Sequence, residues 1–321
     1  MRAMQMIIMT AALATTCSAA AQNYPVRPIR IVVVSTPGGS VDTMARTVGP
    51  KLAERWGQQV LVDNRPGAGG TIAAELVAKA PPDGYTLIMG TVASFATNVS
   101  LRKSLPYDPV LDFAPISLVA TQNLMLLIHP SVPAKSVKEL VALAKRQPGT
   151  LSFASAGNGT GGHLSGELFK LLAGIDMLHV PYKGVAPALV DVVSGQVSMT
   201  FASIISAMPQ VKNNRLRPLA VTGAQRSPAA KELPTMIEAG VKGYESATWY
   251  GLLAPAGTPA DIVTKLNTEV VAILKSPEMY DRLSKEGADP VGNSSAEFAR
   301  HIQTEIEKWR KVIKAAGIQP S

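Results

Sequence analysis

Short apolar runs alternate with amphipathic segments along most of this 321-residue chain. Residues 29–34 are apolar, and residues 40–56 carry apolar side chains at helical spacing, which predicts a strand followed by a helix. The same alternation predicts strands at 59–63, 86–90, 151–155, 177–181 and 197–201, and helices at 71–80, 161–173 and 186–194. It is typical of an α/β fold with mainly parallel sheets.

Helix-start and helix-stop signals support these boundaries. Ser136 and Glu139 form a capping box that opens a helix, and Pro148-Gly149 ends it. Thr258 followed by Pro259 marks another helix start. A long last helix is predicted from about Ser294 or Ser295 to Gly317, with one apolar face made by Phe298, Ile302, Ile306, Trp309 and Ile313.

Two apolar stretches, residues 116–129 and 216–222, look like crossovers between two lobes. Dividing the chain there predicts a discontinuous first domain, residues 22–121 and 219–321. Residues 122–218 then form an inserted second domain. A mature chain of about three hundred residues is long enough for two such domains.

The N-terminus carries the features of a secretory signal peptide over residues 1–21. Met1-Arg2 gives a positive start, residues 6–14 are almost entirely apolar, and Ala19-Ala20-Ala21 is an A-x-A cleavage pattern. The apolar stretch is too short for a membrane anchor. A lipid on Cys17 is the other alternative, although residues 14–16 lack the usual small-apolar signal. We therefore expect an exported, soluble, periplasmic protein without cysteine.

The chain is basic. It has 31 lysines and arginines against 23 aspartates and glutamates, a formal charge of +8, and +7 without Arg2. A basic protein attracts anions over long range. The basic residues are scattered and are not interleaved with the few aromatic residues, which argues against nucleic-acid binding.

Two glycine-rich turns stand where a strand should end and a helix begin. They are Pro37-Gly38-Gly39-Ser40 and Gly157-Asn158-Gly159-Thr160. A helix start has unpaired N–H groups and the positive end of the helix dipole, and glycine lets a ligand approach that backbone. The two turns therefore predict two anion cradles that close on one small acidic molecule. Asp42, in the first helical turn, is favourable with the dipole and is also expected to order the Gly38-Gly39 loop.

Other kinds of site have weaker support in the sequence. Residues 157–162 match the G-x-G-x-x-G pattern of dinucleotide sites, but Asp176 precedes its strand instead of ending it. His163 and Glu167 share a helix face, yet the sequence offers no third metal ligand at suitable spacing. G-x-S-x-G and H-E-x-x-H are absent, and a serine triad from distant residues stays open. Lys183, after a predicted strand, is either a partner for a carboxylate or a solvated loop residue.

Taken together and in order, a set of short motifs resembles the Bug family, the periplasmic receptors of tripartite tricarboxylate transporters. The resemblance covers nearly the whole mature chain. The motifs are Tyr24-Pro25, Arg27-Pro28-Ile29-Arg30, Pro37-Gly38-Gly39 with Asp42 and Ala45-Arg46, Asn64-Arg65-Pro66-Gly67-Ala68-Gly69-Gly70, Pro82-Asp83-Gly84-Tyr85-Thr86-Leu87, Gly159-Thr160 with His163-Leu164 and Glu167-Leu168-Phe169, Val180-Pro181-Tyr182-Lys183-Gly184, Leu219-Ala220-Val221-Thr222 and Ala254-Pro255-Ala256-Gly257-Thr258-Pro259.

The resemblance implies a two-lobed periplasmic-binding-protein fold of the type II Venus flytrap kind, with a mainly parallel sheet flanked by helices in each lobe. It implies no catalytic activity, no cofactor and no bound metal. A ligand carboxylate is expected to be held by backbone amides, hydroxyls and ordered water. The candidate ligand-binding residues are Ser35, Pro37, Gly38, Gly39, Ser40, Asp42, Thr91 and Ser94 in the first lobe, and Ser155, Ala156, Gly157, Asn158, Gly159, Thr160, His163, Tyr182, Phe201 and Ala202 in the second.

The chain departs from the family pattern in two places. Ser35-Thr36 stands where the family often has phenylalanine and proline, and Phe201-Ala202-Ser203 stands where it often has Phe-Asp-Asn. An aspartate in the cleft can pair with the amino group of an amino-acid ligand, and Ala202 cannot. This difference favours a carboxylate without an amino group, either a dicarboxylate or an aromatic acid.

The sequence therefore predicts a periplasmic solute-binding protein that captures a small organic carboxylate between two closing lobes. Its expected partner is the integral-membrane permease of a tripartite tricarboxylate transporter, and we expect a monomer. An alternative of another class is a sensor subunit that presents the same ligand to a two-component signalling kinase. A third, an enzyme on the same fold, requires a reactive pair of side chains in the cleft.

Overall fold

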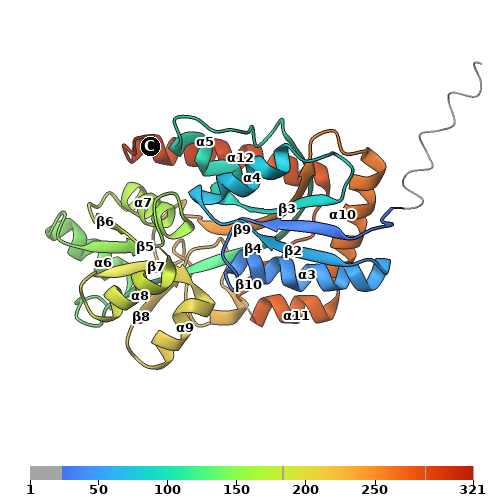
Figure 1. The fold of residues 1–321 in the computed structure, drawn as a ribbon. Helices are drawn as coiled ribbons and strands as arrows, with labels where there is room; N and C mark the ends of the chain where they lie inside the picture. The colour runs from blue at the N-terminus through green and yellow to red at the C-terminus, as the bar shows by residue number, and fades with distance from the viewer. Residues whose placement is uncertain (1–23, 183, 286, 321) are drawn as a thin grey trace, which may run out of the picture.

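The computed structural model describes residues 24–182, 184–285 and 287–320 (Figure 1). The predicted signal peptide, residues 1–21, and Lys183 lie outside the described residues. Within the described part of the chain, no helix is both long and apolar enough to cross a membrane.

The first part of the fold is a set of parallel strands joined by helices. β1 (Ile29–Val33) lies between β2 (Val60–Asn64) and β3 (Thr86–Thr91) and runs parallel to both. The connections carry α3 (Ser40–Trp56), η1 (Ala68–Gly70) and α4 (Thr71–Ala78). The helix predicted at 40–56 is confirmed, and the one predicted at 71–80 ends two residues earlier, at Ala78.

Strand β4 (Phe113–Ile128) runs through the middle of the molecule and changes partners along its length (Figure 1). Its first part pairs antiparallel with β9 (Ala247–Pro255) and β10 (Ala288–Pro290). From Leu124 onward it pairs antiparallel with β7 (Met199–Ser203), and from Met125 with β8 (Arg217–Val221). One continuous strand therefore carries the chain from one part of the fold to the other. The domain limits at 121/122 and 218/219 stay a prediction.

Beyond β7, the sheet continues through β5 (Ser152–Ser155) to β6 (Leu178–Pro181), and these strands run parallel. The strand order is β2-β1-β3-β9-β4-β7-β5-β6, with β8 and β10 also paired to β4. The predicted α/β class is confirmed. The sheet is mixed, not mainly parallel, because β4 and β9 run antiparallel to their neighbours.

Helices cover both parts of the sheet (Figure 1). The remaining helices are α6 (Val137–Arg146), α7 (Gly161–Ala173), α8 (Val185–Val193), α9 (Ile204–Lys212), α10 (Ala260–Leu274), α11 (Pro277–Lys285) and α12 (Ser295–Ala315), with the shorter η2 (Ala93–Thr97), α5 (Asn98–Leu101) and η3 (Pro228–Ala230). The caps predicted at Ser136 and Ser294 are confirmed, whereas the one at Thr258 is wrong: Pro259 is the N-cap of α10, and the Thr258 hydroxyl donates to the Pro255 carbonyl. The Ser136 side chain accepts from the Glu139 N–H, and Ser294 and Glu297 form a reciprocal capping box.

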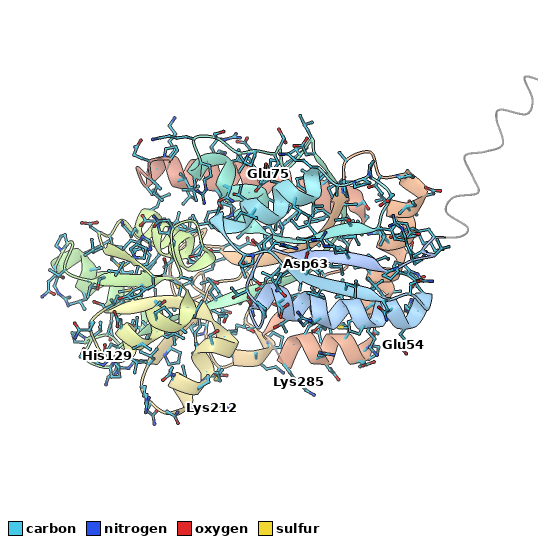
Figure 2. All side chains as sticks on the ribbon, in the orientation of Figure 1. Glu54, Asp63, Glu75, His129, Lys212 and Lys285 are labelled. Atoms are coloured by element: carbon cyan, nitrogen blue, oxygen red, sulfur yellow. The ribbon has the colours of Figure 1, made fainter. Side chains whose placement is uncertain are left out.

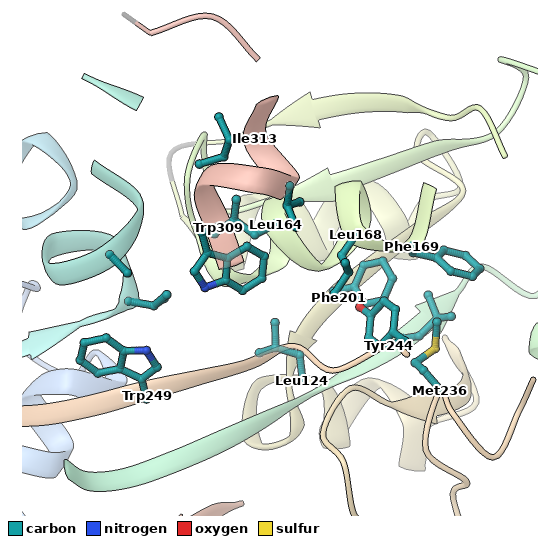
Figure 3. Packing of buried hydrophobic residues seen from close by; sticks show 14 of the residues in the cluster. Leu124, Leu164, Leu168, Phe169, Phe201, Met236, Tyr244, Trp249, Trp309 and Ile313 are labelled. Atoms are coloured by element: carbon teal, nitrogen blue, oxygen red, sulfur yellow. The ribbon is translucent and has the colours of Figure 1, made fainter. Parts of the chain in front are cut away.

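The C-terminal helix α12 ties the two parts together. It packs against η2 and β4 on one side and against α7 on the other. Figure 3 shows its Trp309 and Ile313 near Leu164 of α7, in the same buried cluster as Trp249 of β9. Both tryptophan Nε1 groups donate to Oε2 of the buried Glu305, at 2.8 and 3.1 Å, and Lys308 Nζ lies 3.0 Å from its Oε1. This paired carboxylate links β9 to α12.

The packing of α7 on β5 gives a test of the fold. A Cβ added at Gly166 would lie 2.2 Å from Phe153 Cε2, too close for any real contact. Alanine is the better helix former by about 1 kcal/mol. The clash outweighs this gain in helix propensity, because Phe153 is fully buried and cannot move aside. We therefore expect Gly166→Ala to lower the free energy of unfolding by about 1–3 kcal/mol. Denaturant unfolding measures this. Gly161→Ala on the same helix is the control, because its Cβ would meet nothing closer than 3.5 Å.

Candidate ligand-binding site

A cleft of about 740 Å³ lies between the two parts of the fold. Its walls come from the turns that follow β1, β3, β5 and β7, from the start of α8, and from β4 and β9. Several helices therefore begin at this cleft, and each brings N–H groups that have no partner within its own helix. Among the described residues that line it, none carries a charged side chain.

The turn before α3 forms one wall. Residues 35–41 line the cleft, and α3 begins after Gly39 without any side-chain cap. Asp42 sits behind this turn and accepts from the Gly38 N–H at 2.9 Å, from Asn64 Nδ2 at 2.9 Å and from Arg46 Nε at 2.9 Å. The prediction that Asp42 orders the Gly38-Gly39 loop is confirmed. Burial acts to raise the pKa of Asp42, but these hydrogen bonds outweigh it and leave the pKa lowered.

The start of α7 forms the facing wall. Thr160, Gly161 and Gly162 line the cleft, and here too no side chain caps the helix. The Thr160 hydroxyl instead donates to the Gly157 carbonyl at 2.7 Å. A Cβ at Gly162 would lie 2.7 Å from the Phe201 carbonyl, so glycine is needed for α7 to approach β7 this closely.

The rest of the second wall combines apolar side chains with hydroxyls. Apolar residues from the start of α8 line it: Val185, Ala186, Ala188 and Leu189. At the start of α9, the Ser203 and Ser206 hydroxyls lie 2.7 Å apart and both line the cleft. This wall can pack against a carbon skeleton and donate hydrogen bonds near one end of it.

The floor of the cleft was not predicted. Gln122 of β4 and Thr248 and Tyr250 of β9 line it, and the Tyr250 hydroxyl donates to Gln122 Oε1 at 2.5 Å. Burial raises the pKa of Tyr250 to about 12, so the phenol stays protonated. Gln122 and Thr248 are register partners in the β4–β9 pair, which no local sequence signal indicates.

Of the candidate residues, ten line the cleft: Ser35, Pro37, Gly38, Gly39, Ser40, Thr91, Ala156, Thr160, Phe201 and Ala202. The structure places the other eight outside the lining: Asp42, Ser94, Ser155, Gly157, Asn158, Gly159, His163 and Tyr182.

The side chains of five of those eight bond to neighbouring protein groups, and Asn158 is exposed. Asp42 is bonded as described above. The Ser94 hydroxyl is bonded to the backbone of Thr91, and the Tyr182 hydroxyl donates to Asp191. Ser155 and His163 are bonded to the loop that precedes α7. Their residue types fit a binding site, but their side chains support the walls from behind.

Two histidines stack behind the turn before α7. The rings of His163 and His179 lie 4.0 Å apart at 20°, and Phe153 stacks on the other face of His179 at 4.8 Å. Burial lowers the pKa of His163 to about 3 and that of His179 to about 4, and nearby positive charge adds to the effect. Both imidazoles are therefore neutral at neutral pH. In the described residues, no group of three or more His, Cys, Asp or Glu is placed to hold a metal ion.

A second hollow of about 490 Å³ lies between α9 and α11. Its rim carries Lys212, Glu232, Asp281 and Lys285, which are exposed. Figure 2 shows Lys212 and Lys285 at the lower edge of the molecule. The cleft brings together two longer helices, α3 and α7, whose starts have no side-chain cap, so the cleft is the better candidate for an anion site.

The chain is similar to proteins of a known family of receptors. A family model described as "Tripartite tricarboxylate transporter family receptor" matches residues 44–318. BugT of Bordetella pertussis is 35% identical over 311 residues, which cover 97% of this chain and 95% of BugT.

The chain belongs to the TctC family of tripartite tricarboxylate transporter receptors. The Bug-family resemblance is confirmed, and the chain is accordingly a periplasmic solute-binding protein of this type.

Two solved structures of similar proteins carry carboxylates. One is the R. palustris protein Rpa4515 with adipate, with 43% identity and a TM-score of 0.85 over 93% of this chain and 100% of that one. The other is MatC from Rhodopseudomonas palustris with bound malate, with 35% identity and a TM-score of 0.78 over 90% of this chain and 100% of that one. These matches confirm the predicted fold of this TctC-family receptor.

The stacked histidines make the stability of this receptor depend on pH. Between about pH 4 and 6.5 the unfolded chain binds protons at these positions and the folded chain does not, because both folded pKa values are depressed. Stability should therefore fall as the pH drops from 6.5 to 4, and should not change through these groups above 6.5.

Urea unfolding at a series of pH values measures this. The double variant His163→Asn/His179→Gln should show a flatter profile between pH 4 and 6.5, because neither replacement titrates. Burial also lowers the pKa of His301, which contributes equally in both proteins and cancels in the difference. Equal slopes would show that the stack does not resist protonation.

Proposed function

We propose that this TctC-family receptor captures a small organic carboxylate that lacks an amino group and delivers it to the membrane subunits of a tripartite tricarboxylate-type transporter. The observation that carries the proposal is the cleft itself. It is lined by several helix starts and hydroxyl groups and by no charged side chain among the described residues. The carboxylates named in the two similar structures support the ligand class.

One carboxylate docks on the α3 turn, among residues 35–41. The positive end of the α3 dipole and the first-turn N–H groups offset its charge. The remainder of the ligand meets the second wall at Ala156, Thr160 and the apolar start of α8. A ligand that contacts both walls favours the closed arrangement over an open one, and the transporter would recognise that closed surface.

The absence of a carboxylate at position 202 supports a ligand without an amino group. Ala202 lines the cleft, and no described lining residue offers an anionic partner to an ammonium group. An unpaired ammonium in this cleft would lose its hydration without compensation. The apolar start of α8 suits the carbon chain of a dicarboxylate or the ring of an aromatic acid.

We also propose that the protein reaches the periplasm through a cleaved signal peptide, residues 1–21, and acts as a receptor, not a catalyst. The matched family is described by its receptor role, which supports transport over the alternative of a sensor subunit. The ten lining residues named above are the proposed ligand contacts.

Thermal unfolding with a panel of carboxylates tests the ligand class. A ligand at one hundred times its Kd adds about 2.7 kcal/mol to the free energy of unfolding, which raises Tm by several degrees. We expect dicarboxylates such as adipate or malate, or aromatic acids, to raise Tm, and aspartate and glutamate to leave it unchanged. Stabilisation by the amino acids alone would refute the assignment.

A matched pair of α8 variants tests the site. Ala186 is exposed and lines the cleft, so Ala186→Trp should fill it and weaken binding of the best panel ligand by at least tenfold. Val190, on the same helix, is 65% exposed and lies outside the lining, so Val190→Trp should bind like the wild type. Isothermal titration calorimetry measures both. Equal affinities for the two variants would place the ligand elsewhere.

A further inference from the structure

The loop from Ser155 to Thr160 meets both sides of the cleft. Ala156 and Thr160 line it, and Gly159 lies against η2 and α5 on the opposite side. The Thr97 hydroxyl is 3.4 Å from the Gly159 carbonyl oxygen, to which it donates. A Cβ at Gly159 would lie 2.5 Å from Leu101 Cδ1. The position of this loop therefore determines both a wall of the cleft and a contact across it.

His163 holds the centre of this loop. The Gly159 N–H donates to His163 Nδ1 at 3.0 Å, and both residues are buried. The acceptor role leaves Nδ1 without a proton, so the neutral ring carries its proton on Nε2, which lies 3.9 Å from Glu167 Oε1. Only this tautomer of a neutral histidine can accept from Gly159.

His179 holds the start of the loop through Ser155. His179 Nε2 lies 2.7 Å from Ser155 Oγ, and the same oxygen accepts from the Gly157 N–H at 3.1 Å. The Ser155 hydroxyl is also within 3.1 Å of the Gly157 carbonyl oxygen. Because His179 stacks directly on His163, the two contacts to the loop belong to one packed unit.

We propose that His163 and His179 are positioning residues: they touch no ligand and hold the 155–160 loop in the conformation that forms the second wall of the cleft. The effect on ligand affinity rests on the proposed function, and the effect on the loop does not. A loop with two glycines at positive φ, Gly157 and Gly159, has many alternative conformations. The acceptors His163 Nδ1 and Ser155 Oγ, the latter in contact with His179, select one of them.

Amide hydrogen exchange on the ligand-free protein tests the loop directly. His163→Leu removes the acceptor, and His163→Asn keeps one, because the Asn side-chain oxygen can occupy the place of Nδ1. We expect exchange in residues 155–162 to be about tenfold faster in His163→Leu, the loss expected for one buried hydrogen bond, and near wild type in His163→Asn. His129→Leu, at a histidine bonded to Ser131 outside the cleft, is the control.

A merely structural role for His163 would not produce this pattern, because both variants lose the histidine stack and only one loses the acceptor. Equal exchange in the two variants would overturn the proposal. If His163→Leu does not fold, Ser155→Ala gives the second measurement. It removes one oxygen from the contact to Gly157, and it should speed exchange in the same segment while leaving β1–β3 unchanged.

Adipate binding to the same proteins tests the consequence for the site. Calorimetry should show affinity about tenfold weaker in His163→Leu and close to wild type in His163→Asn. Faster loop exchange with unchanged adipate affinity would refute the link to binding. If the wild type binds no adipate, the proposed ligand class loses support, and the exchange measurement still decides whether the histidines hold the loop.

Discussion

The antiparallel pairing of β4 with β9 is the constraint on which the rest of the molecule depends. Gln122 and Thr248 are partners in this pair, and two residues further along β4, Leu124 is already paired with Ser203 of β7. The Leu124 N–H donates to the Thr222 hydroxyl, and the Thr222 carbonyl accepts from the Ser246 N–H. Leu124, Thr222 and Ser246 thus join three segments that cross between the two parts of the fold. The two walls of the cleft lie on either side of these segments.

Close packing at this crossing leaves little freedom in the choice of residues. A Cβ at Gly223 would lie 1.8 Å from Asn123 Oδ1, and one at Gly251 would lie 2.0 Å from Phe298. The paired carboxylate of Glu305 then fixes α12 to β9 through two tryptophans. Helices α4, α7 and α12 contribute to one buried cluster, which joins the two parts of the fold and restricts the relative movement of α7 and α12.

Local signals in the sequence were sufficient for most strands and helices and for the turn before α3, although β9, α9 and α11 were not predicted. Ser136 and Ser294 cap the helices that they were expected to cap, and Asp42 holds the Gly38 N–H. These features depend on residues within four positions of one another. The floor could not be predicted in the same way, because Gln122 and Tyr250 meet only through pairing between strands 128 residues apart. The sequence also could not separate the ten candidate residues that line the cleft from the eight that do not, because residue type does not reveal which face of a loop a side chain occupies.

A cleft whose described lining carries no charged side chain makes a specific demand on its backbone. A lysine or arginine side chain can adjust to its ligand, whereas an N–H group is only as well placed as the loop that carries it. The α3 turn meets this demand with Asp42, whose carboxylate is paired and directed away from the cleft. The turn before α7 meets it with two neutral histidines: His163 accepts from the Gly159 N–H, and His179 is hydrogen-bonded to Ser155, so neither adds charge. In both turns, a titratable side chain outside the cleft lining fixes the backbone that the proposed ligand would meet.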